Sequence, residues 1–291
     1  MQAPASPPPP ISTGDGAPAS RRRVLDFDPK RDGFAFTNAF VWTEHDLDFL
    51  TEQLQPLLVG AGGVLGGLAG QFLGRRPVLG SLVAGTVGAV AARWQGRALV
   101  EAVARQWSSF GLCGGMALAA VERWPLKAGL PTAKLERERV RALLRRRQAR
   151  TLRAAWQPFL RYWLGVRLRP DGVPYAPYGD DLLAAYREIR QRIDGGRPVV
   201  IGLVGDAPDV FTQHQVACFG YADHEGVAGG TLLVYDPNSP GEVKTVTVEA
   251  FGSHPRRCFV STDIETGPRG DGTYFVSQRH NHLSTLFVVD A

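Results

Sequence analysis

The apolar residues of this chain change their period near Gly196, and this change limits the folds that its 291 residues can adopt. Before Gly195 apolar positions recur at helical spacing, whereas after Gly196 they alternate with polar ones, as is typical of strands. A helical half followed by an antiparallel sheet predicts an α+β fold. Turn-forming residues separate seven alternating runs, at 198–204, 214–221, 231–235, 244–248, 257–261, 274–278 and 283–289.

Composition divides the chain into four segments. The first is rich in proline and alanine, and it is expected to be disordered because it cannot bury enough apolar surface to offset its ordering entropy. The second is an arm whose phenylalanines alternate, as in a short strand or an extended segment with one aromatic face. The third is rich in glycine and alanine, and the fourth is the main domain. Their bounds are 1–23, 24–55, 56–93 and 94–291.

The cysteines and the N-terminal region favour a reducing compartment. Three cysteines, Cys113, Cys218 and Cys258, are too few and too odd in number for a disulfide framework. No apolar run of signal-peptide length follows the arginines at 21–23. We therefore expect a cytoplasmic protein, or one that is exported without a cleaved signal.

Small residues recur at every fourth position within 56–93, which predicts a helical hairpin with a Gly/Ala seam. The chain breaks at Arg75–Arg76–Pro77 into apolar arms of roughly 18 and 15 residues, at or below the length that crosses a bilayer. Two interpretations stay open: a tightly packed hairpin, or membrane contact through 57–92. The second makes the chain a membrane-associating or interaction protein that acts through this hairpin.

Basic charge is concentrated between Arg123 and Arg169, where 14 basic residues face 2 acidic ones although the whole chain carries only +5. Such a stretch can contact nucleic acid, an anionic membrane or an acidic partner. It can also be the solvated face of an arginine-rich helix. Arginine supplies 29 of the 33 basic residues, so a general bias is enough to explain the run. We favour the solvated face and expect no nucleic-acid binding.

Three residues in the order Cys, His, Asp could perform nucleophilic catalysis. Cys113 begins a predicted helix, whose positive end favours the thiolate. His214 begins one predicted strand and Asp236 ends the next, and an antiparallel hairpin brings these positions together. A thiolate that attacks a carbonyl, an imidazole that moves the proton and a carboxylate that holds the imidazole Nδ1 proton make a thiol hydrolase. The alternative is a non-catalytic module with a buried thiol, a structural histidine and a common Asp-Pro-Asn turn.

Asp236 and Asn238 compete for the role of the third member. Either side chain could orient an imidazole. Asp236 is favoured because it ends a strand before Pro237 turns the chain, whereas Asn238 lies in the turn, where its amide can satisfy local backbone groups.

The sequence around these residues matches a known pattern. Cys-Gly-Gly-Met at 113–116, His-Gln-Val at 214–216 and Tyr-Asp-Pro-Asn at 235–238 resemble papain-like cysteine peptidases of bacteria, in particular the group related to bacteriocin-leader-processing peptidases. The resemblance covers roughly 110–248. It implies a papain-like α+β fold with 56–93 as an insertion, a peptide or amide substrate, an acyl-thioester intermediate and no cofactor. Hydrolysis, deamidation and transfer all fit it.

The same resemblance raises the question of the oxyanion donor. Papain-like enzymes place a glutamine six residues before the cysteine, whereas Gln106 lies seven before Cys113. Asn38 and Ser109 are the other candidates. Asn38 lies in a Phe-x-Phe-x-Asn run that, like Leu-Arg-Arg-Arg-Gln at 144–148, looks similar to uncharacterised bacterial members.

A metal site is not expected. His280 and His282 have ligand-like spacing, but they fall at a predicted hairpin tip with no partner cysteine or carboxylate nearby, and a metal needs three or four ligands. The sequence also has no phosphate loop, dinucleotide fingerprint or zinc-finger spacing.

Overall fold

The computed structural model describes eleven stretches of the chain, and the predicted hairpin at 56–93 and the predicted strand at 274–278 lie outside them. The described stretches are 21–53, 97–98, 100–101, 104–105, 110–127, 130, 137–167, 179–205, 213–250, 258–262 and 281–291. The named helices are α1 (Pro29–Asp32), α4 (Cys113–Arg123), the 3₁₀ turn η1 (Trp124–Leu126), α5 (Arg137–Arg167) and α6 (Gly179–Asp194).

The second half of the chain forms the antiparallel sheet that the alternating runs predict, so the α+β class is confirmed. The strands are β1 (Arg22–Val24), β2 (Val199–Gly205), β3 (His214–Asp223), β4 (Ala228–Tyr235), β5 (Val243–Ala250), β6 (Cys258–Thr262) and β7 (Asn281–Val288). β1 begins two residues before the boundary at 24 that composition predicts for the arm. It pairs with the far end of β3, and residues 1–20 lie outside the described part.

The sheet closes on itself. Its order is β3-β2-β7-β6-β5-β4, and β4 pairs back with β3, so six strands form a ring. β1 extends the same edge of β3 that β2 occupies, because β2 pairs with 214–218 and β1 with 220–222. The closed ring has an inner and an outer face, and each face takes every second residue of a strand.

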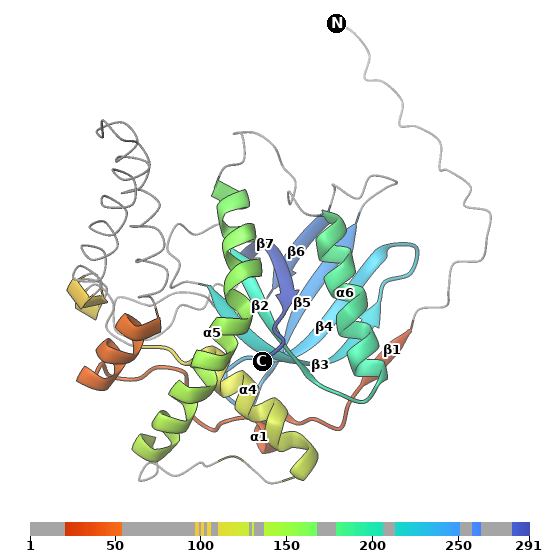
Figure 1. Ribbon diagram of the computed structural model, residues 1–291. Coiled ribbons are helices and arrows are strands. Elements are labelled where there is room, and N and C mark those ends of the chain that lie inside the picture. The colour runs from red at the N-terminus through yellow and green to blue at the C-terminus, as the bar shows by residue number, and fades with distance from the viewer. Residues whose placement is uncertain are drawn as a thin grey trace, which may run out of the picture.

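Helix α6 packs on the inner face of the ring. It contacts β1, β2, β3, β4, β5 and β7 (Figure 1). Leu182, Leu183, Tyr186, Ile189 and Ile193 recur at the spacing of one helical face, and this apolar stripe is buried. Leu182, Ile189 and Ile193 are fully enclosed. Its partners are the inward-facing residues Ile201, Leu203, Val216, Cys218, Leu232, Val234, Val246, Val248 and Leu286.

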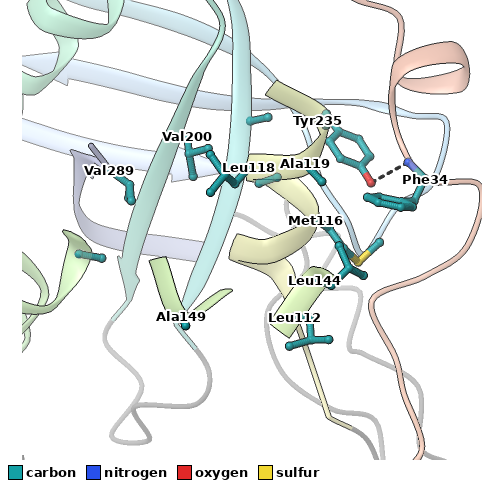
Figure 2. Close-up of a cluster of buried hydrophobic side chains, with 14 of the residues drawn as sticks. Phe34, Leu112, Met116, Leu118, Ala119, Leu144, Ala149, Val200, Tyr235 and Val289 are labelled. Carbon is teal, nitrogen blue, oxygen red and sulfur yellow. Dashed lines mark hydrogen bonds between the residues drawn. The ribbon is translucent and has the colours of Figure 1, made fainter. Parts of the chain in front are cut away.

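Helices α4 and α5 form a second core on the outer face of the ring, together with Val200, Ala217 and Phe219. Figure 2 shows Leu118 and Ala119 of α4 beside Val200 of β2. The two helices approach closely: a Cβ on Gly115 would lie 2.3 Å from the Leu144 carbonyl oxygen. A glycine is therefore required at this crossing.

The N-terminal arm runs across the start of α4 as an extended segment. The structure records one bridge in it, between Phe40 and Phe110, rather than a strand. The backbone N–H of Phe34 donates to the Tyr235 hydroxyl at 3.0 Å (Figure 2). A helix over 44–53 follows, and Asp46 caps it by accepting from the Thr43 N–H at 2.9 Å. The arm is thus joined to both α4 and β4.

Asp46 also ties the arm to the basic helix. It is fully buried, and it forms ion pairs with Arg141 and Arg145 of α5. The predicted solvated face describes Arg146 and Arg153, which are exposed. It is wrong for Arg141, which is 4% exposed. A sequence run of like charge does not show that a distant carboxylate will fold over part of it.

No helix in the described ranges is long and apolar enough to cross a membrane.

Candidate active site

Cys113 is the first residue of α4 and is partly exposed at the outer rim of the strand ring. Gly114 allows the helix to start against β3, because a Cβ there would lie 2.2 Å from Gln215 Oε1 and 2.4 Å from Thr151 Oγ1. The Cys113 sulfur accepts backbone hydrogen bonds from Gln215 and Gly114, and it bonds the His214 side chain. Cys113 therefore lies against the start of β3.

His214 and Asp236 meet as the hairpin geometry predicts. In the β3–β4 register Ala217 lies opposite Tyr235, which places the start of β3 beside the end of β4. His214 Nε2 lies 2.6 Å from Asp236 Oδ1, and both side chains are buried. The expectation that the carboxylate holds the Nδ1 proton is wrong. Asp236 lies against Nε2, so Nδ1 is the ring nitrogen left for the hydrogen bond to Cys113.

Asp236, rather than Asn238, contacts the imidazole. The Asn238 backbone N–H donates to Asp236 Oδ1 at 2.9 Å, so the turn after β4 holds the carboxylate that the histidine meets. Asp236 Oδ2 is buried and has no hydrogen-bond partner among the described residues. The carboxylate is fully enclosed by protein, where its charge acts strongly on the imidazole.

The proximity of these groups shifts two pKa values in opposite directions. Burial alone would raise the pKa of Cys113. The charge of His214 and the hydrogen bonds from His214, Gln215 and Gly114 outweigh this effect, so the pKa of Cys113 is lowered. Burial alone would lower the pKa of His214. The charges and hydrogen bonds of Asp236 and Cys113 outweigh this effect and raise the pKa of His214 to about 10. This arrangement favours a thiolate beside an imidazolium.

Cys218 provides an internal comparison. It lies on the same strand as His214 and is fully enclosed by the inner core. Burial raises the pKa of this thiol to about 12. Two cysteines of one chain thus differ in ionisation because only Cys113 has a cationic neighbour.

Of the three oxyanion candidates, the structure describes Asn38, whereas Gln106 and Ser109 lie outside the described residues. Asn38 is buried directly in front of α4, and its Oδ1 accepts from the Leu112 N–H. Its own backbone N–H donates to the Pro237 carbonyl at 3.0 Å. Asn38 therefore lies at the start of α4, and its role as an oxyanion donor stays a prediction.

Two glutamines at the site were missed by sequence reasoning. Gln148 of α5 accepts the Gly115 N–H at 2.8 Å and so caps the first turn of α4. Gln215 donates its backbone N–H to the Cys113 sulfur. In the sequence, the run at 144–148 carries only a resemblance, and Gln215 stands out only as a neighbour of His214. A polar residue on the apolar face of α5 was the available signal for Gln148.

The described residues contain no group of three or more histidine, cysteine or acidic side chains that could hold a metal. Asn281 and His282 begin β7, and the side chains at 280–282 lie outside the described part.

Comparison with protein-family models, with curated proteins and with solved structures finds no match to this chain.

Proposed function

We propose that this chain is a thiol-dependent hydrolase of peptides or amides, built on a papain-like α+β fold. Cys113 is the nucleophile, His214 the general acid and base, and Asp236 the residue that orients the imidazole. The observation that carries the proposal is the continuous hydrogen-bonded chain from the Cys113 sulfur through the His214 ring to Asp236. Nucleophile, base and orienting group in contact are the parts that acyl transfer needs.

The first half of the reaction forms a thioester. The Cys113 thiolate attacks the carbonyl carbon, and the negative charge that develops on oxygen lies near the N-terminus of α4, whose positive end stabilises it. The carbon–nitrogen bond then breaks, and the His214 imidazolium gives its Nδ1 proton to the leaving amine. Asp236 stabilises the imidazolium and fixes the ring so that Nδ1 faces the sulfur.

The second half releases the acyl group. The now neutral imidazole takes a proton from water, the resulting hydroxide adds to the thioester carbonyl, and the carbon–sulfur bond breaks. The products are a carboxylic acid and the thiolate–imidazolium pair. An amine in place of water gives transfer, and a primary amide substrate gives deamidation. All three outcomes share the same thioester, so the same three residues serve each of them.

The test uses the full chain and its Cys113→Ala variant, with Cys218→Ala as the matched control. Peptide pools are incubated in water enriched in heavy oxygen, and the products are read by mass spectrometry. Hydrolysis places heavy oxygen in a new carboxyl group, in the wild type and in Cys218→Ala but not in Cys113→Ala. Product formation that survives in Cys113→Ala would overturn the proposal.

The ionisation of Cys113 can be measured independently, without a substrate. Iodoacetamide alkylates thiolates, so the pH dependence of Cys113 labelling reports its pKa directly. A labelling midpoint near pH 8.5, the pKa of an ordinary thiol, would show that Cys113 is not an activated nucleophile.

A further inference from the structure

Asn38 belongs to the N-terminal arm, and it forms hydrogen bonds to the neighbours of two site residues, Cys113 and Asp236. Its side-chain Oδ1 accepts the N–H of Leu112, the residue before Cys113. Its backbone N–H donates to the carbonyl of Pro237, the residue after Asp236, at 3.0 Å. Asn38 is 2% exposed, so water does not compete for these bonds. One residue of the arm therefore holds both the start of the nucleophile's helix and the turn of the carboxylate.

The bond to Leu112 fixes the position where α4 begins. Leu112 is the N-cap residue of this helix, and no side chain caps the helix from that position. Leu112 is fully buried, so its N–H needs a protein acceptor, and a buried N–H that loses its acceptor carries a large desolvation penalty. Without Asn38 the chain before Cys113 would shift to find another partner, and the sulfur would shift with it.

Asn38 is itself held in place from both sides along the chain. Toward the N-terminus, Phe34 bonds the Tyr235 hydroxyl. Toward the C-terminus, Phe40 pairs with Phe110 in both directions, at 3.0 and 2.7 Å. The arm is therefore a fixed support and not a loose segment that follows α4.

We propose that Asn38 is a positioning residue, which sets the Cys113 sulfur against the His214–Asp236 pair; this rests on the function proposed above. It acts through its acceptor oxygen on Leu112, and so its role is distinct from donating a hydrogen bond to an oxyanion. If the start of α4 shifts, the contact between sulfur and imidazole weakens, and the thiolate loses the cation that stabilises it.

The test compares Asn38→Leu with Thr43→Ala, using iodoacetamide labelling of Cys113 as a function of pH. Thr43→Ala removes the hydroxyl bond to Asp46 from the same arm. It keeps the backbone N–H bond to Asp46 and does not touch Leu112 or Pro237. We expect the labelling midpoint of Asn38→Leu to move up toward the ordinary value of about 8.5, and its labelling rate at pH 6 to fall about ten-fold or more. Thr43→Ala keeps the wild-type midpoint.

Three outcomes overturn parts of this proposal in different ways. If the wild-type midpoint is low and Asn38→Leu leaves it unchanged, the proposed role of Asn38 is wrong, whereas the proposed thiol hydrolase stands. A wild-type midpoint near 8.5 removes both. An equal shift in Thr43→Ala shows that loosening the arm, and not the bond to Leu112, sets the pKa.

A measurement on the wild type keeps the proposal testable if Asn38→Leu does not fold. Hydrogen exchange of the Leu112 amide reports the bond to Asn38 directly, because a buried, bonded N–H exchanges slowly. We expect protection comparable to that of the Met116 amide, which bonds the Leu112 carbonyl inside α4. Rapid exchange at Leu112 with slow exchange at Met116 would overturn the proposal.

Discussion

His214 meets Asp236 through Nε2, at 2.6 Å, and this choice of nitrogen decides which atom of the ring faces the sulfur. Because Asp236 accepts the Nε2 proton, Nδ1 is the atom left to exchange a proton with Cys113. The catalytic proton of the proposed reaction is therefore carried by the nitrogen nearer to the backbone of β3. Because the His214 side chain is also buried, its ring has little room to turn between the two halves of the reaction.

Asp236→Ala should lower the turnover rate at least about 100-fold, the low end for disrupted general acid–base catalysis. The imidazolium would lose both its counter-charge and its fixed orientation. Asn238→Ala should cost far less, because Asn238 supports the carboxylate through a backbone N–H that the substitution keeps. The two variants are compared by kcat on one substrate, with folding checked by circular dichroism. The opposite ranking in folded variants would reassign the third residue.

Cys113 should react with iodoacetamide at a pH where an ordinary thiol does not. A thiol of pKa 8.5 is only about 1% ionised at pH 6.5, whereas the lowered pKa of Cys113 gives it a larger thiolate fraction at the same pH. Cys218 should stay unlabelled while the chain is folded, because burial raises its pKa to about 12 and encloses it. Peptide mapping after labelling distinguishes the two. Equal labelling of both cysteines at pH 6.5 would contradict the ion pair.

Hydrolysis should follow a bell-shaped pH profile. Activity rises as pH passes the lowered pKa of Cys113, because the thiolate is the nucleophile. It falls as pH passes the raised pKa of His214, about 10, because the imidazolium that protonates the leaving amine is then lost. Initial rates from pH 4 to 11 measure both limbs. A fall already complete by pH 7.5 would mean that His214 has an ordinary pKa of about 6.5.

Asp46→Ala should destabilise the chain by about 3–5 kcal/mol, because it removes the buried carboxylate that pairs with Arg141 and Arg145. Glu188→Ala is the matched control: its pair with Arg192 is half-exposed on α6, and its loss should cost about 0.5 kcal/mol. Urea unfolding of both variants gives the comparison. Similar costs for the two would show that the buried cluster around Asp46 is as weak as a surface pair.

Gly115→Ala should be poorly tolerated, since its Cβ would lie 2.3 Å from the Leu144 carbonyl oxygen. Either α4 or α5 must move, at a cost of about 1–3 kcal/mol for an overpacked core. Gly195→Ala is the control, because the nearest atom to its Cβ would be 3.4 Å away. Thermal unfolding of both variants measures the difference. A Tm for Gly115→Ala equal to that of Gly195→Ala would mean that the helices have room to part.

The sequence indicated much of this architecture because its signals are local. Alternation predicted strands near β2, β3, β4, β5, β6 and β7 within a few residues, and the spacing of Leu182, Ile189 and Ile193 predicted the buried stripe of α6. Closure of the ring was not predicted. Closure requires β4 to pair with β3 and β7 to lie between β2 and β6. Alternation sets which residues face inward, but it does not set which strands are neighbours.

The candidate site was predictable in its members and less so in its geometry. A helix start and a strand hairpin are enough to bring Cys113, His214 and Asp236 together. No local pattern in the sequence encodes which ring nitrogen of His214 meets Asp236. Arg141 shows the same limit. Its burial depends on Asp46, which lies 95 residues earlier in the chain.

The closed ring also restricts how an extended peptide could be held. Each of the six ring strands, in the described part of the chain, already has a neighbour on either side. Where both sides of a strand are paired, a ligand therefore cannot add itself to the ring as another strand, which is a common way for sheets to capture peptides. The same closure protects these strands from edge-to-edge association with other molecules, so concentrated solutions of the folded chain should resist that route to aggregation.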